Sequence, residues 1–135
     1  MSIVTPPNVR YVILCHEALA DPEWPGRVRV IGLIPELRWP QGSTTPFHLE
    51  RLTVLLVLAG GRGAGQAWID CIDDETGTPI STSGKKPIEF KTKDPLEPFL
   101  GQIKLRSCYF PRPGWYRVRF LLDDNIIAEQ MLIVR

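Results

Sequence analysis

The chain has 135 residues, a formal net charge of +1 at neutral pH and a hydrophobic content of 44%. This length fits a single domain, residues 1–135, and allows a core that needs no disulfide bond or metal for stability. The near-neutral charge gives no general attraction to nucleic acid or to anionic membranes, so neither is an expected partner. The longest apolar run, 54–59, has the length of a strand and is too short for a membrane span.

Cysteine usage predicts a reducing compartment. The sequence has three cysteines, Cys15, Cys71 and Cys108, and each falls in a strand-like segment. An odd number argues against a disulfide framework and favours buried free thiols. The apolar run 11–15 is too short for the core of a secretory signal. We therefore expect a cytoplasmic protein.

The N-terminal half predicts short strands and long loops. Strands are expected at 9–16 and 27–34, with a loop rich in proline and glycine at 21–26 between them. The segment 35–47 contains three prolines and reads as a long irregular connection, a type of segment that is often functional or mobile.

The strongest expected strand, 50–59, is apolar on both faces. Leu55 and Val57 lie on one face, and the other face carries Leu52, Val54, Leu56 and Leu58. Such a strand is either central and covered on both sides or half of an oligomer contact. We expect the second face to be covered by Leu37 and Trp39 from the preceding loop, or else by a second chain.

The C-terminal half continues the pattern. The glycine-rich segment 60–65 is expected to be a hairpin turn, followed by strands at 66–73, 79–82, 88–92 and 102–109. In the last of these, the residues expected to share a face are Ile103, Leu105, Ser107 and Tyr109. Residues 110–135 contain the signals of a β-hairpin that turns at 123–125.

No segment shows sustained helical periodicity. About seven to nine short strands predict an all-β fold, an antiparallel β-sandwich of immunoglobulin-like architecture. Shared parity on the alternating strands predicts a core that contains Leu52, Val54, Leu56, Ile69, Ile103, Leu105, Val118 and Phe120.

Four segments resemble a family of small bacterial β-sandwich proteins of unassigned function. The resemblance covers nearly the whole chain and implies the same fold and a cytoplasmic location, but no activity or catalytic residue. The segments are Tyr11-Val-Ile-Leu-Cys-His16, Val30-Ile-Gly-Leu-Ile34, Pro46-Phe-His-Leu49 and Phe110-Pro-Arg-Pro-Gly-Trp-Tyr116.

Tests for specific chemistry predict no catalytic residue, no metal site and no cofactor. Cys15, His16 and Glu17 are of metal-binding types, but neighbours in a regular strand point to opposite faces. A metal or catalytic site would need His48 and another cysteine to fold nearby. The glycines of 60–65 lack the spacing and the following helix of a phosphate-binding loop.

A surface feature gives the candidate interaction site. Cations alternate along two segments joined by a short connection, so they are expected to cluster on neighbouring antiparallel strands. Acidic neighbours such as Glu129, Asp70 or Glu89 would make this a solvated face. Otherwise it would bind an anion or nucleic acid, or the tryptophans would bind carbohydrate. The candidate residues are Lys104, Arg106, Arg117, Arg119, Trp115, Trp39, Leu55 and Val57.

These observations predict a non-enzymatic interaction module that forms a homodimer, with possible unidentified protein partners. The alternative is a ligand-binding module that uses the outer sheet face or the loop 35–47. An enzyme is the third hypothesis.

Overall fold

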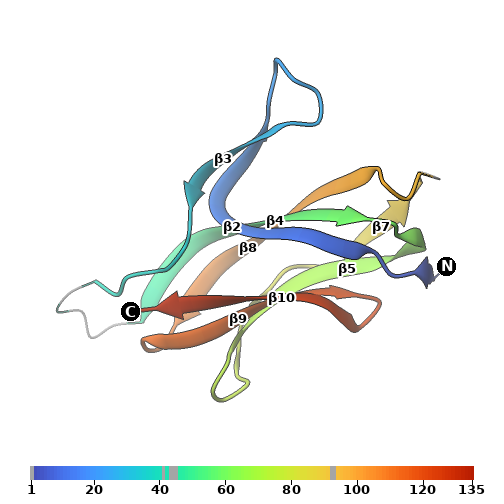
Figure 1. Cartoon of the computed structure of the whole chain (residues 1–135). Coiled ribbons are helices and arrows are strands. Elements are labelled where there is room, and N and C mark those ends of the chain that lie inside the picture. The colour runs from blue at the N-terminus through green and yellow to red at the C-terminus, as the bar shows by residue number, and fades with distance from the viewer. Residues whose placement is uncertain (1, 41, 43–45, 92–93) are drawn as a thin grey trace.

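The computed structural model describes residues 2–40, 42, 46–91 and 94–135. Within these residues the chain forms ten strands and no helix, and the strands make two antiparallel sheets packed against each other (Figure 1). The predicted β-sandwich is confirmed, with one strand more than the expected maximum because residues near the N-terminus form β1. The six-stranded sheet contains β1 (Ile3–Thr5), β5 (Arg62–Asp73), β6 (Pro79–Thr82), β7 (Lys86–Phe90), β9 (Gly114–Leu122) and β10 (Asn125–Val134). The four-stranded sheet contains β2 (Asn8–Ala20), β3 (Val28–Leu33), β4 (Phe47–Ala59) and β8 (Pro98–Phe110).

Strand β5 organises the six-stranded sheet. It pairs with β9 along one edge and with β6 and β7 along the other, while β10 lies beyond β9. The order in the four-stranded sheet is β3-β2-β4-β8. The predicted terminal hairpin is confirmed as β9 and β10, which turn at Asp123 and Asp124, both with positive φ.

Two short connections join the sheets and are not hairpin turns. The glycine-rich segment after β4 leads into β5 of the opposite sheet, so the expected hairpin there is wrong. The connection from β8 to β9 also passes from one sheet to the other. The two segments with alternating cations are therefore not neighbouring strands, and the predicted cluster of four cations does not form.

The core lies between the sheets. All eight residues predicted to share the core belong to one buried cluster, together with Phe110, Tyr116, Leu132 and others. Inward-facing side chains from both sheets remove apolar surface from water, which is the main driving force for folding. Because β4 is central in its sheet, its inner face is buried almost completely.

The side chains of β4 and β8 change face part-way along each strand. Leu49 and Cys108 are opposite one another and pack in the core, as do Leu52 and Leu105 farther along. In each strand the two inward-facing residues are separated by two residues instead of one, so the strict alternation of faces is broken between them. Ser107, at this point, has a φ of 56°. Contrary to the alternation expected for 102–109, Ser107 and Tyr109 are exposed, and Cys108 and Phe110 are buried.

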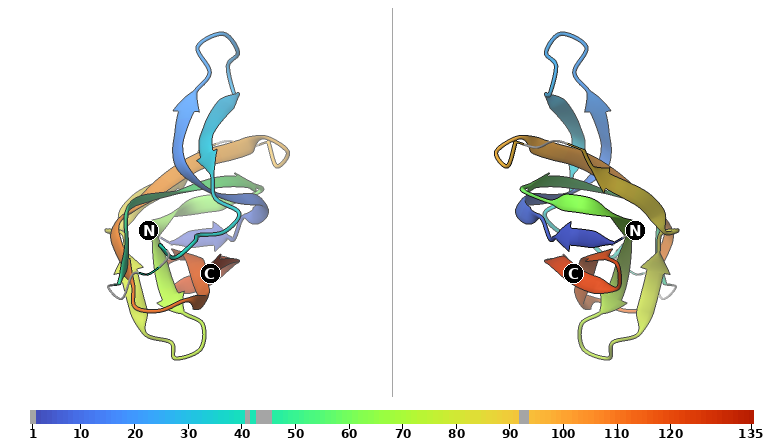
Figure 2. Two further views of the ribbon diagram at one scale, coloured as in Figure 1. Left: turned by 90° about the vertical axis from the view of Figure 1, so that its left-hand side faces the viewer. Right: turned by 90° about the vertical axis from the view of Figure 1, so that its right-hand side faces the viewer.

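Part of the outer face of β4 is covered by β2 of the same chain. Leu55 is only 4% exposed and packs with Cys15 and Ala18 of β2 in a small second cluster. Leu37 and Trp39 of the loop before β4, which were expected to provide this cover, pack against the main core instead. Leu37 also pairs in parallel with Val134 at the end of β10. The β2–β3 hairpin extends beyond the sandwich, at the top of Figure 1 and in both views of Figure 2.

Candidate functional site

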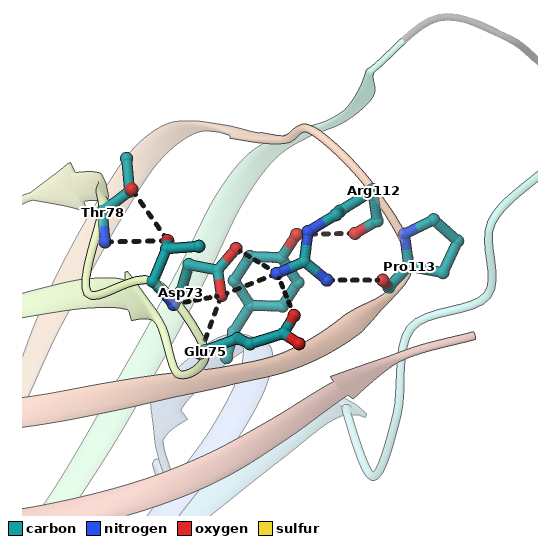
Figure 3. A network of polar contacts seen from close by, with 7 residues as sticks. Asp73, Glu75, Thr78, Arg112 and Pro113 are labelled. Atoms are coloured by element: carbon teal, nitrogen blue, oxygen red, sulfur yellow. Dashed lines mark hydrogen bonds and ion pairs between the residues drawn. The ribbon is translucent and has the colours of Figure 1, made fainter.

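A polar network connects two loops at one end of the sandwich (Figure 3). The carboxylate of Asp73, at the end of β5, is 4% exposed. It accepts hydrogen bonds from the backbone N–H of Glu75 at 2.9 Å and from Arg112 Nη2 at 2.9 and 3.1 Å. Arg112 also lies 2.6 Å from the carboxylate of Glu75. The buried charge is thus paired and hydrogen-bonded, as stability requires.

Tyr116 of β9 also belongs to this network. Its hydroxyl donates a hydrogen bond of 2.5 Å to the backbone carbonyl of Arg112, four residues earlier. Its ring is buried and meets Phe110 edge-on at 4.8 Å between centroids. Burial raises the pKa of the phenol. Because the network satisfies its own donors and acceptors, we interpret it as a structural clamp on the β8–β9 crossing.

Two of the four predicted cations are neutralised by neighbouring acids. Arg119 forms two hydrogen bonds with Asp70, at 2.8 and 2.6 Å. Arg117 contacts Asp74 at 2.6 Å and Glu129 at 3.1 Å. These hydrogen bonds raise the pKa of both arginines. The expected pairing with Asp70 and Glu129 is confirmed, so this outer face has little excess positive charge.

The tryptophans form no joint platform. Trp115 is exposed at the start of β9, whereas Trp68 of β5 lies opposite Leu121, near the other end of that strand. Six residues of a strand span about 20 Å, too far for one sugar ring to bridge. The ammonium group of Lys85 instead lies over the ring of Trp68, with Nζ 4.6 Å from the ring centroid. Trp39 is half-buried and packs against the core, with its ring 6.2 Å from that of Phe47.

Two surfaces that the sequence did not single out stand out in the structure. The first is the hairpin surface, an exposed apolar region on the projecting β2–β3 hairpin. Ile31 is 42% exposed and Leu33 is 64% exposed, although both lie in a strand. The hairpin surface comprises Leu19, Trp24, Val30, Ile31 and Leu33, with Val30 and Ile31 on opposite faces of the hairpin. An unpaired strand edge with such side chains is a template for pairing with another chain.

The second surface is a polar hollow of about 570 Å³ on the four-stranded sheet. We call it the His–Arg basin, and it is lined by His16, His48, Glu50, Arg51, Arg106 and Ser107. It contains both histidines of the chain, which are 32 positions apart in the sequence (48 − 16). Only the pairing of β2, β4 and β8 brings them together, and no local spacing signals it.

Leu55 and Val57, both predicted to belong to the interaction surface, differ in burial. Leu55 is buried within its own chain, as described above, and is unavailable to a partner. Val57 is half-buried and lies between Tyr11 of β2 and Leu100 of β8, which are both exposed. Lys104, also half-buried, lies opposite Thr53 on the same sheet.

A further hollow is lined by two acids, Glu89 and Asp123, and Asp123 is hydrogen-bonded within the chain. It has a volume of about 610 Å³, lies beside β5 and β7, and includes the carboxylate of Asp123. That carboxylate accepts hydrogen bonds from the backbone N–H groups of Gln66 at 2.8 Å and of Ile3 at 3.3 Å. A side chain at Gly65 would place its Cβ 2.6 Å from the same carboxylate. We interpret Asp123 as a structural anchor for β1 and β5.

All three cysteines are free and buried. Burial raises the pKa of each thiol, and that of Cys71 rises to about 12. Thiols of this kind are poor nucleophiles at neutral pH, since the thiolate is the reactive form. Within the described residues no group of three or more histidine, cysteine or acidic side chains is arranged to hold a metal ion.

A search of the described residues for a helix able to cross a membrane finds none. The chain matches no protein-family model and is not significantly similar to any curated protein. The resemblance to bacterial β-sandwich proteins therefore stays a prediction.

Proposed function

We propose that this chain is a non-enzymatic, immunoglobulin-like interaction module that forms a homodimer through the β2–β3 hairpin. The observation that carries the proposal is the unpaired edge of β3, which combines with the exposed apolar hairpin surface. The charge-paired outer face and the unreactive thiols favour an interaction role over an enzymatic one.

Strand order supports the immunoglobulin-like architecture. Immunoglobulin domains place strands A, B and E in one sheet and C, F and G in the other. Here β2, β4 and β8 lie side by side in one sheet, and β5, β9 and β10 in the other. The Tyr116 hydrogen bond matches the tyrosine corner, in which a tyrosine near the start of strand F bonds to backbone upstream. The three cysteines are all free, so they do not form the disulfide that joins the two sheets of antibody domains.

The edge of β3 is suited to pairing with another strand. Among the described residues its only strand partner is β2, so the backbone groups on its other edge have no strand partner. Proteins usually protect such an edge with lysine, proline or a covering loop. Strand β3 contains a single charged residue, Arg29, and no lysine or proline.

A second copy of the chain is the occupant that we propose. Antiparallel pairing of two β3 strands about a two-fold axis would bring Val30 and Ile31 of both copies to the centre, apolar against apolar. A stable dimer buries roughly 1,200–2,000 Å² in total, more than two short paired strands provide. The protruding hairpin has further apolar groups, Leu19 and Trp24, to supply the remainder.

Sedimentation analysis of purified protein at high micromolar concentration tests this proposal. We expect a dimer for the unaltered chain and a monomer for Ile31→Lys, because a charge at the paired edge opposes strand pairing. Ile126→Lys is the matched control, since Ile126 is also exposed but lies on β10 of the other sheet. A monomer for the unaltered chain, or a dimer that Ile31→Lys leaves intact, would overturn the proposal.

We also propose a cytoplasmic location. The support is the three buried free thiols, which persist without pairing in a reducing compartment.

A further inference from the structure

The His–Arg basin brings together groups from three strands of one sheet. His16 comes from β2, Arg51 and His48 from β4, and Arg106 from β8. Arg51 and Arg106 are directly opposite one another in the antiparallel pair formed by β4 and β8. Like charges at such positions repel and destabilise the sheet unless an anion compensates them.

The protein's own acids compensate this pair only in part. Arg51 lies 3.8 Å from Glu17 and shares a hydrogen bond of 3.0 Å with the ring of His16. Its Nε atom is buried and has no hydrogen-bond partner in the described structure. The guanidinium of Arg106 is exposed, and neither an ion pair nor a side-chain hydrogen bond joins it to the other described residues. Glu50 is the acid among the residues that line the basin.

Two of the remaining residues that line the basin, His48 and Ser107, have distinctive geometry. The ring of His48 stacks on Tyr109, with centroids 4.2 Å apart and planes 7° from parallel. Ser107 has a left-handed backbone conformation, with a φ of 56°. Such a conformation is costly for a residue other than glycine and is often found at functional sites. It occurs where the side chains of β8 change face, and the exposed Ser107 lines the basin.

We propose that the His–Arg basin binds the phosphate group of a small solute. A phosphate has oxygens in several directions, which suits donors that come from separate strands, namely Arg51, Arg106, Ser107 and the histidines. Charge-assisted hydrogen bonds from guanidinium groups to phosphate are short and strong, and two parallel bonds can form from one arginine. A volume of about 570 Å³ leaves room for a small organic group beside the phosphate.

Proton NMR of the two histidine rings is a direct test, because the chain has only two histidines. Inorganic phosphate and glycerol 3-phosphate are titrated separately at constant pH and ionic strength, with sodium chloride as the control. We expect the ring signals of His48 and His16 to shift saturably with at least one of the two phosphates. The titrant with the lower dissociation constant shows whether the basin prefers free phosphate or a phosphate ester. The absence of a saturable shift with both would overturn the proposal.

Charge-removing variants separate a built site from general electrostatic attraction. Arg106→Gln should weaken phosphate binding about tenfold, the equivalent of one charge-assisted hydrogen bond. Lys104→Gln removes the same charge from the same strand outside the basin lining and should change binding less than about twofold. Glu50→Gln should tighten binding, since it removes a negative charge from the basin. Equal losses for Arg106→Gln and Lys104→Gln would overturn the proposal.

Discussion

Arg112 Nη2 donates to both carboxylate oxygens of Asp73, at distances of 3.1 and 2.9 Å (Figure 3). Asp73 ends β5, and Arg112 lies in the connection that carries the chain from β8 to β9. The contact therefore joins the two sheets at the point where the chain passes between them. Removal of the carboxylate leaves two backbone N–H groups, of Glu75 and Thr76, without their acceptor.

We expect Asp73→Ala to lower the free energy of unfolding by about 2–3 kcal/mol, since it removes hydrogen bonds to a buried charged group. Arg112 is 41% exposed, so water lessens the cost of its lost partner. Urea denaturation measures the change. Glu75→Ala is the control, because this exposed acid contacts the same arginine and should contribute at most about 1 kcal/mol. Equal losses from the two variants would contradict the proposed clamp.

The buried hydroxyl of Tyr116 provides a second test of the crossing. Tyr116→Phe keeps the ring but leaves the carbonyl of Arg112 without this donor, and should cost about 1–2 kcal/mol. Thermal unfolding followed by circular dichroism measures the loss. Tyr109→Phe is the matched control, because Tyr109 is exposed on β8. If Tyr116→Phe were as stable as the control, the tyrosine hydrogen bond would not be a fold-defining contact.

The shared core predicts a large effect at Phe120. This side chain is 2% exposed and packs between the sheets. Phe120→Ala should destabilise by about 3–5 kcal/mol through lost burial and the cavity left behind. Leu96→Ala, at a residue that is 73% exposed, should change stability by less than about 0.5 kcal/mol. Chemical denaturation of both variants checks this, and an unchanged midpoint for Phe120→Ala would contradict the assigned core.

The thiol of Cys71 should make stability depend on pH under alkaline conditions. Burial raises its pKa from the ordinary value of 9.0 to about 12. Between these values the unfolded chain loses the proton and the folded chain keeps it, so stability falls as pH rises from about 9 toward 12. One such group contributes up to about 1.4 kcal/mol per pH unit. Cys71→Ala should show a shallower fall in unfolding free energy over this range, and identical slopes would contradict the shift.

Much of the local structure follows from the sequence. Short apolar or alternating segments bounded by turn residues predicted nine of the ten strands, and shared parity identified the core residues Val118 and Phe120. The turn between β9 and β10 was predicted because Asp123 and Asp124 tolerate the positive φ that it requires. These features depend on neighbours within a few residues, so the sequence contains the necessary information.

The arrangement of the strands depends on tertiary structure. Alternation shows which side chains face inward but not to which sheet a strand belongs, so Arg106 and Arg117 were wrongly placed on neighbouring strands. The change of face at Ser107 requires a paired irregularity in β4 and β8 that neither strand signals alone. The His–Arg basin arises the same way, because His16 and His48 meet only through pairing between strands distant in sequence. Local patterns determined the elements, and pairing between strands that are distant in sequence determined which of their side chains share a site.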